Sequence, residues 1–162
     1  MSVTIRRAIE SDAVAACHVV RRSIVELCVT DHRYDEETLA AWLSNKTVEM
    51  FTRLIMAEAK SCVVAVLNDK VCGFGHINHS GNVGLLYVDP EARFLGASTA
   101  MLHWLEEEVF RLGVNTVSLN SSDTARQFYT SRGYVQTGEP VAGFGITFGW
   151  PMTKRLANYQ TE

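Results

Sequence analysis

The sequence has no apolar run close to the roughly 20 residues that a helix needs to cross a bilayer. Its amino terminus carries Arg6 and Arg7, but no apolar segment follows them, so the pattern of a signal peptide is missing. Internal repeats, low-complexity segments and a linker are missing as well. The 162 residues therefore predict one soluble domain, residues 1–162, that makes no membrane contact and resides in the cytoplasm.

Metal-binding patterns are also absent. None of the four cysteines, Cys17, Cys28, Cys62 and Cys72, belongs to a Cys-x-x-Cys pair or a Cys/His cluster, so we expect no metal site. Each cysteine lies in an apolar periodic segment, which favours buried, reduced thiols and fits a cytoplasmic location. Cys28, near the end of the first predicted helix, is also placed to line a pocket.

An excess of positive charge is absent too. The formal net charge is −3 and the isoelectric point is near 6.0, so no overall basic field attracts nucleic acid, and we expect no nucleic-acid partner. The sequence lacks the Gly-Lys-Ser/Thr of a Walker A loop and the three-glycine spacing of a dinucleotide fingerprint. The sequence therefore does not favour a nucleotide-hydrolysing enzyme or a hydride-transferring enzyme.

The most informative stretch runs from Val83 to Tyr134. Residues 83–88 form a short apolar run, typical of a strand buried on both faces, and Asp89-Pro90 ends it. The following helix is predicted from apolar residues that share one face, namely Leu95, Leu102, Leu105, Val109 and Leu112. Residues 114–119 predict the next strand, and residues 125–129 a short helix that ends at Gly133.

The segment before the long helix is a candidate anion site. Gly96, Ala97 and Ser98 are small enough to let a ligand approach the backbone, and the first N–H groups of a helix have no intrahelical partners. A glycine in this place is more often a simple turn, so the pattern alone leaves both interpretations open.

The rest of the chain supplies further strands and helices. Alternating and periodic patterns predict strands at residues 3–6, 62–67, 71–78 and 146–150, and helices that begin after Asp12, Asp35 and Thr47. Pro151 places the far end of the last strand at an edge or a bend. Strands flanking a strand-helix-strand crossover favour a mixed α/β (α+β) fold with helices on both faces of the sheet.

Three motifs follow one another in the central stretch: Leu86-Tyr87-Val88-Asp89-Pro90, Arg93-x-x-Gly96-x-Ser98 and Ala125-x-x-Phe128-Tyr129-x-x-x-Gly133-Tyr134. In this order they resemble the GNAT superfamily of acetyl-CoA-dependent N-acetyltransferases. The resemblance implies a single GNAT-like domain with a mixed, mostly antiparallel central sheet, splayed central strands and helices on both faces. It also implies acetyl-CoA as cosubstrate, and transfer of the acetyl group through a ternary complex to a primary amine of a small molecule, peptide or protein.

The resemblance assigns cofactor binding to eleven residues. They are Leu86, Tyr87, Val88, Arg93, Phe94, Leu95, Gly96, Ala97, Ser98, Thr99 and Ser122. Three places depart from the family pattern: Ser98 stands where glycine or alanine is usual, Phe94 and Leu95 where glycine or basic residues are common, and Ser122 where asparagine is common.

Tyr129 is the expected general acid. A tyrosine has a reference pKa of about 10, above the value of about 8.5 for a thiol, so at neutral pH it holds a proton for the departing thiolate. By helical periodicity alone, Tyr129 would be a core aromatic. Candidates for the base are His76, His79, Asp89, Asp31 and His32, and no spacing selects one of them.

The acceptor is not identified by the sequence. In the family, the loop between the first two helices lines the acceptor site, which implies Asp31, His32 and Tyr34 as substrate-binding residues; each is equally explained as part of a solvated loop. The alternative function is a non-catalytic acyl-CoA-binding or sensing module on the same fold. A homodimer is a further expectation, through an exposed last strand near Ile146.

Overall fold

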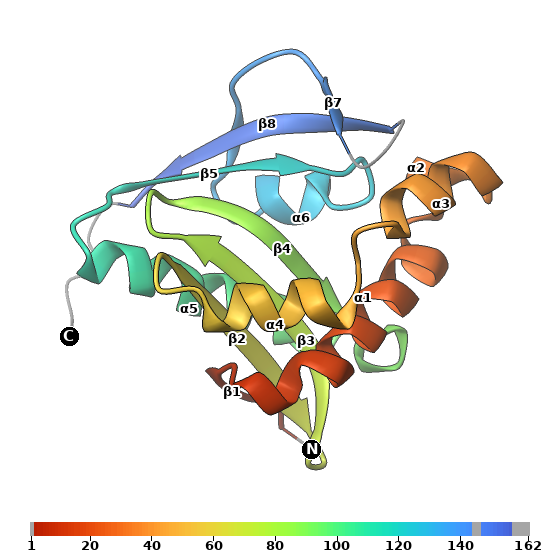
Figure 1. The fold of residues 1–162 in the computed structure, drawn as a ribbon. Helices are drawn as coiled ribbons and strands as arrows, with labels where there is room; N and C mark the ends of the chain where they lie inside the picture. The colour runs from red at the N-terminus through yellow and green to blue at the C-terminus, as the bar shows by residue number, and fades with distance from the viewer. Residues whose placement is uncertain (1, 144–146, 157–162) are drawn as a thin grey trace.

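The computed structural model describes residues 2–143 and 147–156, and its framework is one sheet with the strand order β1-β2-β3-β4-β5-β8-β6, with β7 paired to β8 (Figure 1). The strands are β1 (Thr4–Arg7), β2 (Lys60–Leu67), β3 (Lys70–Asn78), β4 (Asn82–Val88), β5 (Thr116–Ser121), β6 (Val135–Gln136), β7 (Val141–Gly143) and β8 (Thr147–Arg155). The helices are α1 (Ala13–Leu27), α2 (Val29–His32), α3 (Glu36–Leu43), α4 (Val48–Met56), α5 (Ala97–Arg111) and α6 (Arg126–Thr130).

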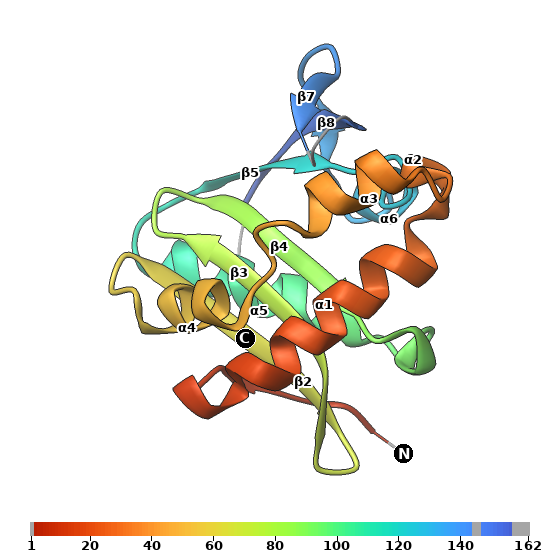
Figure 2. The same ribbon diagram turned by 45° about the vertical axis from the view of Figure 1, so that its right-hand side comes forward.

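Helices cover both faces of the sheet, as the sequence predicts. Helices α1 and α4 lie on one face and α5 on the other (Figures 1 and 2). The buried side chains form one cluster on each face: Met101 and Leu105 of α5 belong to the first, and Ile24 of α1 and Phe51 of α4 belong to the second. Their relative exposures are all 0%. Within the described residues, no helix is both long and apolar enough to span a bilayer.

The two central strands, β4 and β5, diverge. They run parallel and pair only at their start, where Asn82 is opposite Ser118 and Val83 opposite Leu119. Every other strand pair within the described residues is antiparallel. The predicted splay is therefore confirmed, and it leaves the second half of β4 without β5 as a neighbour.

Several details of the sequence prediction are wrong. Helix α5 begins only at Ala97, because Gly96 adopts a left-handed conformation with φ of 80°, so Leu95 precedes the helix. Leu95 and Leu112 are 45% and 55% exposed, and the buried face is carried by Leu102, Leu105 and Val109. Residues 86–88 of β4 are only half-buried rather than buried on both faces, because the strand splits away from β5 there.

Pro151 lies inside a strand rather than at its edge or at a bend. Strand β8 continues to Arg155 between β5 and β6, with Pro151 opposite Asn120. The Pro151 carbonyl accepts a hydrogen bond from Thr137 N at 2.9 Å, so the nitrogen of the same residue points to that side and the ladder with β5 loses no donor. Ile146, on which the homodimer expectation rests, lies outside the described residues.

A buried ionic network joins α5 to β8. Glu106 is 2% exposed; its carboxylate accepts a hydrogen bond from the Tyr134 hydroxyl at 2.7 Å and pairs with Lys154 Nζ at 3.1 Å. Removing one member of a buried pair leaves the other without compensation. The Glu106→Ala variant should therefore lose about 3 kcal/mol in the free energy of unfolding, measured by urea denaturation.

Glu107 provides the matched control on the same helix. Its side chain is 45% exposed and pairs with His103 at 3.1 Å. The Glu107→Ala variant should change the free energy of unfolding by about 0.5 kcal/mol or less, because exposed pairs contribute little. Equal losses in the two variants would contradict the structural role given to Glu106.

Candidate active site

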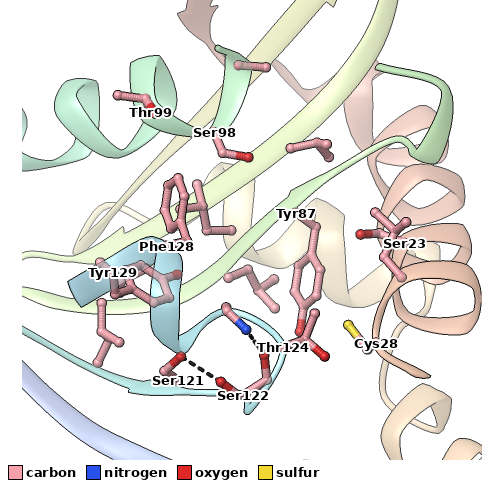
Figure 3. A pocket seen from close by; sticks show the side chains of 18 of the residues that line it. Ser23, Cys28, Tyr87, Ser98, Thr99, Ser121, Ser122, Thr124, Phe128 and Tyr129 are labelled. Carbon is pink, nitrogen blue, oxygen red and sulfur yellow. Dashed lines mark hydrogen bonds between the residues drawn. The ribbon is translucent and has the colours of Figure 1, made fainter. Parts of the chain in front are cut away.

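A pocket of about 400 Å³ opens where β4 and β5 diverge. It is bounded by α1 on one side, by the start of α5 on the other, and by α6 and the end of β5 (Figure 3). Ten of the eleven predicted cofactor residues line it: Leu86, Tyr87, Val88, Arg93, Phe94, Gly96, Ala97, Ser98, Thr99 and Ser122. Leu95 does not.

The start of α5 forms the first wall. The helix opens with the hydrogen bond from Ala100 N to Gly96 O at 3.0 Å, so the N–H groups of Ala97, Ser98 and Thr99 precede the intrahelical ladder. Gly96 has φ of 80°, a conformation in which a side chain is strained. The Ser98 hydroxyl points into the pocket (Figure 3). These N–H groups and the helix dipole favour an anion here.

Arg132 adds a cation beside this helix start. Its guanidinium donates to Thr99 Oγ1 at 2.7 and 3.0 Å and lies over the Phe128 ring at 3.9 Å from the centroid. Together with Arg93 it makes the α5 end of the pocket electropositive. The sequence analysis missed Arg132, because it lies in the turn after α6 and belongs to no motif.

The second wall is the free half of β4. Leu86, Tyr87 and Val88 line the gap, and because β5 does not pair with this half, its backbone groups are available to an extended ligand. Ser122 faces it from the β5–α6 loop, where its hydroxyl accepts a hydrogen bond from Ala125 N at 3.2 Å. Ser122 thus helps to shape the start of α6 as well as the pocket wall.

Tyr129 of α6 lies at the pocket wall next to Phe128 (Figure 3). It is 6% exposed, and its ring packs edge-on against Phe128 and Tyr134, at centroid distances of 5.2 and 5.5 Å. Burial raises the pKa of Tyr129 above its ordinary value. The phenol is therefore protonated at neutral pH, the state that proton donation requires.

The three predicted substrate residues are not among those that line the pocket. The Asp31 carboxylate accepts hydrogen bonds from Asp123 N at 2.7 Å, from Thr124 N at 3.0 Å and from the Thr124 hydroxyl. His32 is 1% exposed; its Nε2 lies 2.9 Å from Ile24 O, and its Nδ1 accepts from Tyr34 N. Tyr34 is 63% exposed. Asp31 and His32 thus hold the α1–α2 region and the β5–α6 loop in place.

The remaining base candidates do not line the pocket either. His79 Nε2 bonds the Ser61 hydroxyl at 3.0 Å, and Asp89 pairs with Arg22 at 3.3 Å while capping Glu91 N. His76 is 8% exposed, its ring nitrogens bond no described residue, and burial followed by the nearby Lys60 charge lowers its pKa to about 4.

Known proteins with the same architecture were found by comparison of structures. A GCN5-related N-acetyltransferase from Rhodopseudomonas palustris matches with a TM-score of 0.85 and 24% identity, over 96% of this chain and 97% of that one. The PaiA N-acetyltransferase from Thermoplasma acidophilum, in complex with coenzyme A, matches with a TM-score of 0.79 and 20% identity, over 96% of this chain and 99% of that one. An aminoglycoside 6'-N-acetyltransferase from Enterococcus faecium matches with a TM-score of 0.71 and 16% identity, over 98% of this chain and 99% of that one.

All three structures are those of proteins named as N-acetyltransferases, and that of PaiA contains coenzyme A. Residues 30–156 also match the family model described as an acetyltransferase (GNAT) domain, so the chain belongs to the GNAT acetyltransferase family. Among curated proteins, no sequence matches the chain significantly.

Proposed function

We propose that the protein transfers an acetyl group from acetyl-CoA to a primary amine of a small molecule, peptide or protein, with both substrates bound together. The observation that carries this proposal is that one continuous pocket joins the start of α5 to buried Tyr129 and to α1. A cofactor held at the α5 end would therefore present its thioester within the same cavity that an acceptor enters from the α1 side.

The cosubstrate fits the residues present. The N–H groups of Ala97 and Ser98, with Arg132 beside them, suit the diphosphate of coenzyme A. The free edge of β4 suits the amides of its pantetheine arm, because an extended peptide-like chain can bond a strand edge. A backbone N–H of Leu86, Tyr87 or Val88 would polarise the thioester carbonyl.

Tyr129 is the proposed general acid. Its proton would pass to the sulfur of the departing coenzyme A thiolate while the carbon–sulfur bond breaks and the amine nitrogen bonds the carbonyl carbon. The nitrogen would then lose one proton to solvent as the amide forms, and the Tyr129 phenolate would regain one from solvent. Two observations support this role: burial raises the pKa of Tyr129, so the phenol keeps its proton, and Tyr129 lines the pocket. Positioning the two reactants provides much of the rate acceleration in such a reaction.

Direct transfer is favoured over an acyl-enzyme. The one cysteine that lines the described pocket is Cys28, and burial, with a smaller contribution from Asp31, raises its pKa to about 12. The thiolate is the nucleophilic form, so this thiol is a poor acyl acceptor at neutral pH. An amine attacking the thioester within a ternary complex needs no such residue.

The pH dependence follows from the groups in the wall. No histidine, aspartate or glutamate is among the described residues that line the pocket, so the amine should reach it already deprotonated. We expect kcat/KM to rise about tenfold per pH unit up to the pKa of the acceptor, without a break near 6.5. The raised pKa of Tyr129 predicts no decline below about pH 10, since its proton is kept longer than usual.

A profile measured with two amines of different pKa checks this prediction. The inflection should move with the amine. An inflection that stays at the same pH near 6–7 for both amines would show an enzyme base instead.

Turnover tests the proposed function itself. Purified protein with acetyl-CoA and a panel of amines should release free coenzyme A thiol only when an accepted amine is present, and the product should carry one acetyl group by mass spectrometry. Acetyl-CoA binding with no turnover on any amine would favour the non-catalytic acyl-CoA-binding module instead.

A further inference from the structure

The α1 side of the pocket forms a separate arm. We use the name acceptor arm for one wall of the pocket. It is made by Ser23 and Leu27 of α1, Cys28 between α1 and α2, Tyr87 of β4 and Thr124 of the β5–α6 loop. In Figure 3, Ser23 and Cys28 face Tyr87 across this arm, while Ser98 and Thr99 lie at the opposite end of the view. The α5 end is the electropositive end, so the α1 end is left for the acceptor.

The acceptor arm carries no ionised side chain at neutral pH. Burial raises the pKa of Cys28 to about 12, and burial is also the main cause that raises the pKa of Tyr87 above its ordinary value. Ser23, Leu27 and Thr124 do not titrate. The charged residues of the described pocket wall are Arg93 and Arg132, both at the α5 end.

The acidic groups packed nearby are engaged elsewhere. Asp31 acts on Cys28 and Tyr87 electrostatically, but it does not line the pocket, and its carboxylate receives the two N–H groups and the hydroxyl of the β5–α6 loop. Asp89 and Glu26 both pair with Arg22, at 3.3 and 3.0 Å. A cation in the acceptor arm would therefore meet no carboxylate of the described residues directly.

Ser23 is the hydroxyl side chain that α1 contributes to the arm. It is 3% exposed and lines the pocket. A hydroxyl oxygen carries two lone pairs, so it can accept an N–H from a ligand in the arm.

Building on the proposed function, we propose that the acceptor is a small monoamine with an apolar body, whose nitrogen bonds the Ser23 hydroxyl, and that the arm excludes polycations such as polyamines and aminoglycosides. A second ammonium group could enter only by losing its water without gaining a counter-charge, which is strongly unfavourable. A lone amine entering as the free base meets no such penalty, and the apolar wall favours its body.

The test compares three monoamines, 2-phenylethylamine, benzylamine and 4-methylaniline, with spermidine and kanamycin, by kcat/KM at one pH with saturating acetyl-CoA. We expect the best monoamine to exceed both polycations at least about 100-fold. Turnover of spermidine or kanamycin at or above the monoamine level would overturn the proposal, as would acetyl-CoA binding without turnover of any monoamine. Failure of acetyl-CoA to bind would instead overturn the proposed function.

Two variants at Ser23 separate positioning from folding. Ser23→Ala should raise KM for the best monoamine about fivefold or more, with kcat and the Kd of acetyl-CoA nearly unchanged, because one hydrogen bond to the acceptor is lost. Ser23→Asp, which adds a carboxylate to the arm, should shift the preference toward spermidine. An unchanged KM in Ser23→Ala would remove Ser23 from the acceptor site, even if Ser23→Asp fails to fold.

Discussion

Replacing Ser98 with glutamate should weaken acetyl-CoA binding at least about 100-fold, equivalent to about 2.7 kcal/mol. Ser98 is the second residue of α5, and its side chain points into the pocket at the N–H groups proposed to hold the diphosphate (Figure 3). A carboxylate there would occupy the anion site and repel the phosphates. Calorimetric titration with acetyl-CoA measures the effect.

The Ser98→Glu change should not lower the free energy of unfolding, although it weakens acetyl-CoA binding. A negative charge in the first turn of a helix interacts favourably with the helix dipole, so Ser98→Glu should fold at least as stably as the unmodified protein. Ser98→Gln, of similar size but without charge, should weaken binding by less than about tenfold. Equal losses in both variants would point to steric blockage and contradict the electrostatic role of this site.

The Tyr129→Phe variant should lower kcat by roughly 10²–10⁴-fold, the usual contribution of a general acid. The Kd of acetyl-CoA should stay within about twofold, because the ring and its packing against Phe128 and Tyr134 are retained. Single-turnover rates and calorimetry on the same preparation separate the two quantities. A variant with full activity would leave Tyr129 as a core aromatic only.

Tyr134 provides the control for the loss of a phenol hydroxyl. Its ring packs edge-on against Tyr129 at a centroid distance of 5.5 Å, but its hydroxyl donates to buried Glu106. Tyr134→Phe should therefore lower the free energy of unfolding while kcat remains near the unmodified value. A fall in kcat as large as that of Tyr129→Phe would mean that the packing of the two rings, rather than a proton, limits the reaction.

The strand-loop-helix order of residues 83–134 could be predicted because it depends on local patterns. Apolar runs, Asp89-Pro90 and Gly96 each act within a few residues, and the structure places strand, turn and helix accordingly. Two predicted caps are also confirmed: the Asp35 and Thr47 side chains accept hydrogen bonds from Thr38 N and Met50 N. A cap of α1 by Ser11 or Asp12 is predicted as well and is wrong, because the Asp12 carboxylate accepts from Ile9 N instead. The four cysteines are buried and free, as their apolar surroundings indicate.

The sequence predictions are wrong at positions whose conformation depends on tertiary contacts. Leu95 and Leu112 continue the apolar spacing of α5, but the left-handed Gly96 and the end of the helix at Arg111 place both outside it. Pro151 is tolerated inside β8 because its nitrogen faces away from β5, a matter of register that spacing does not reveal.

Residue roles in the site needed the fold as well. Asp31 accepts a hydrogen bond from Asp123 N of the β5–α6 loop, which is 92 residues away in the sequence. A local sequence pattern does not predict such a contact. Ser23 of α1 and Arg132, in the turn after α6, line one pocket although they lie far apart in the sequence. The motif-bearing residues near the start of α5 were predictable because their neighbours in space are also neighbours in sequence.

The most direct test of the central claim is calorimetric titration of the purified protein with acetyl-CoA, with ATP as the comparison ligand. The structure predicts saturable binding at one site per chain, with a Kd on the order of 1–100 µM, and no comparable binding of ATP, which lacks the pantetheine arm that the free edge of β4 suits. No saturable heat with acetyl-CoA up to about 1 mM would contradict the assignment of the pocket between β4 and β5 as an acetyl-CoA site.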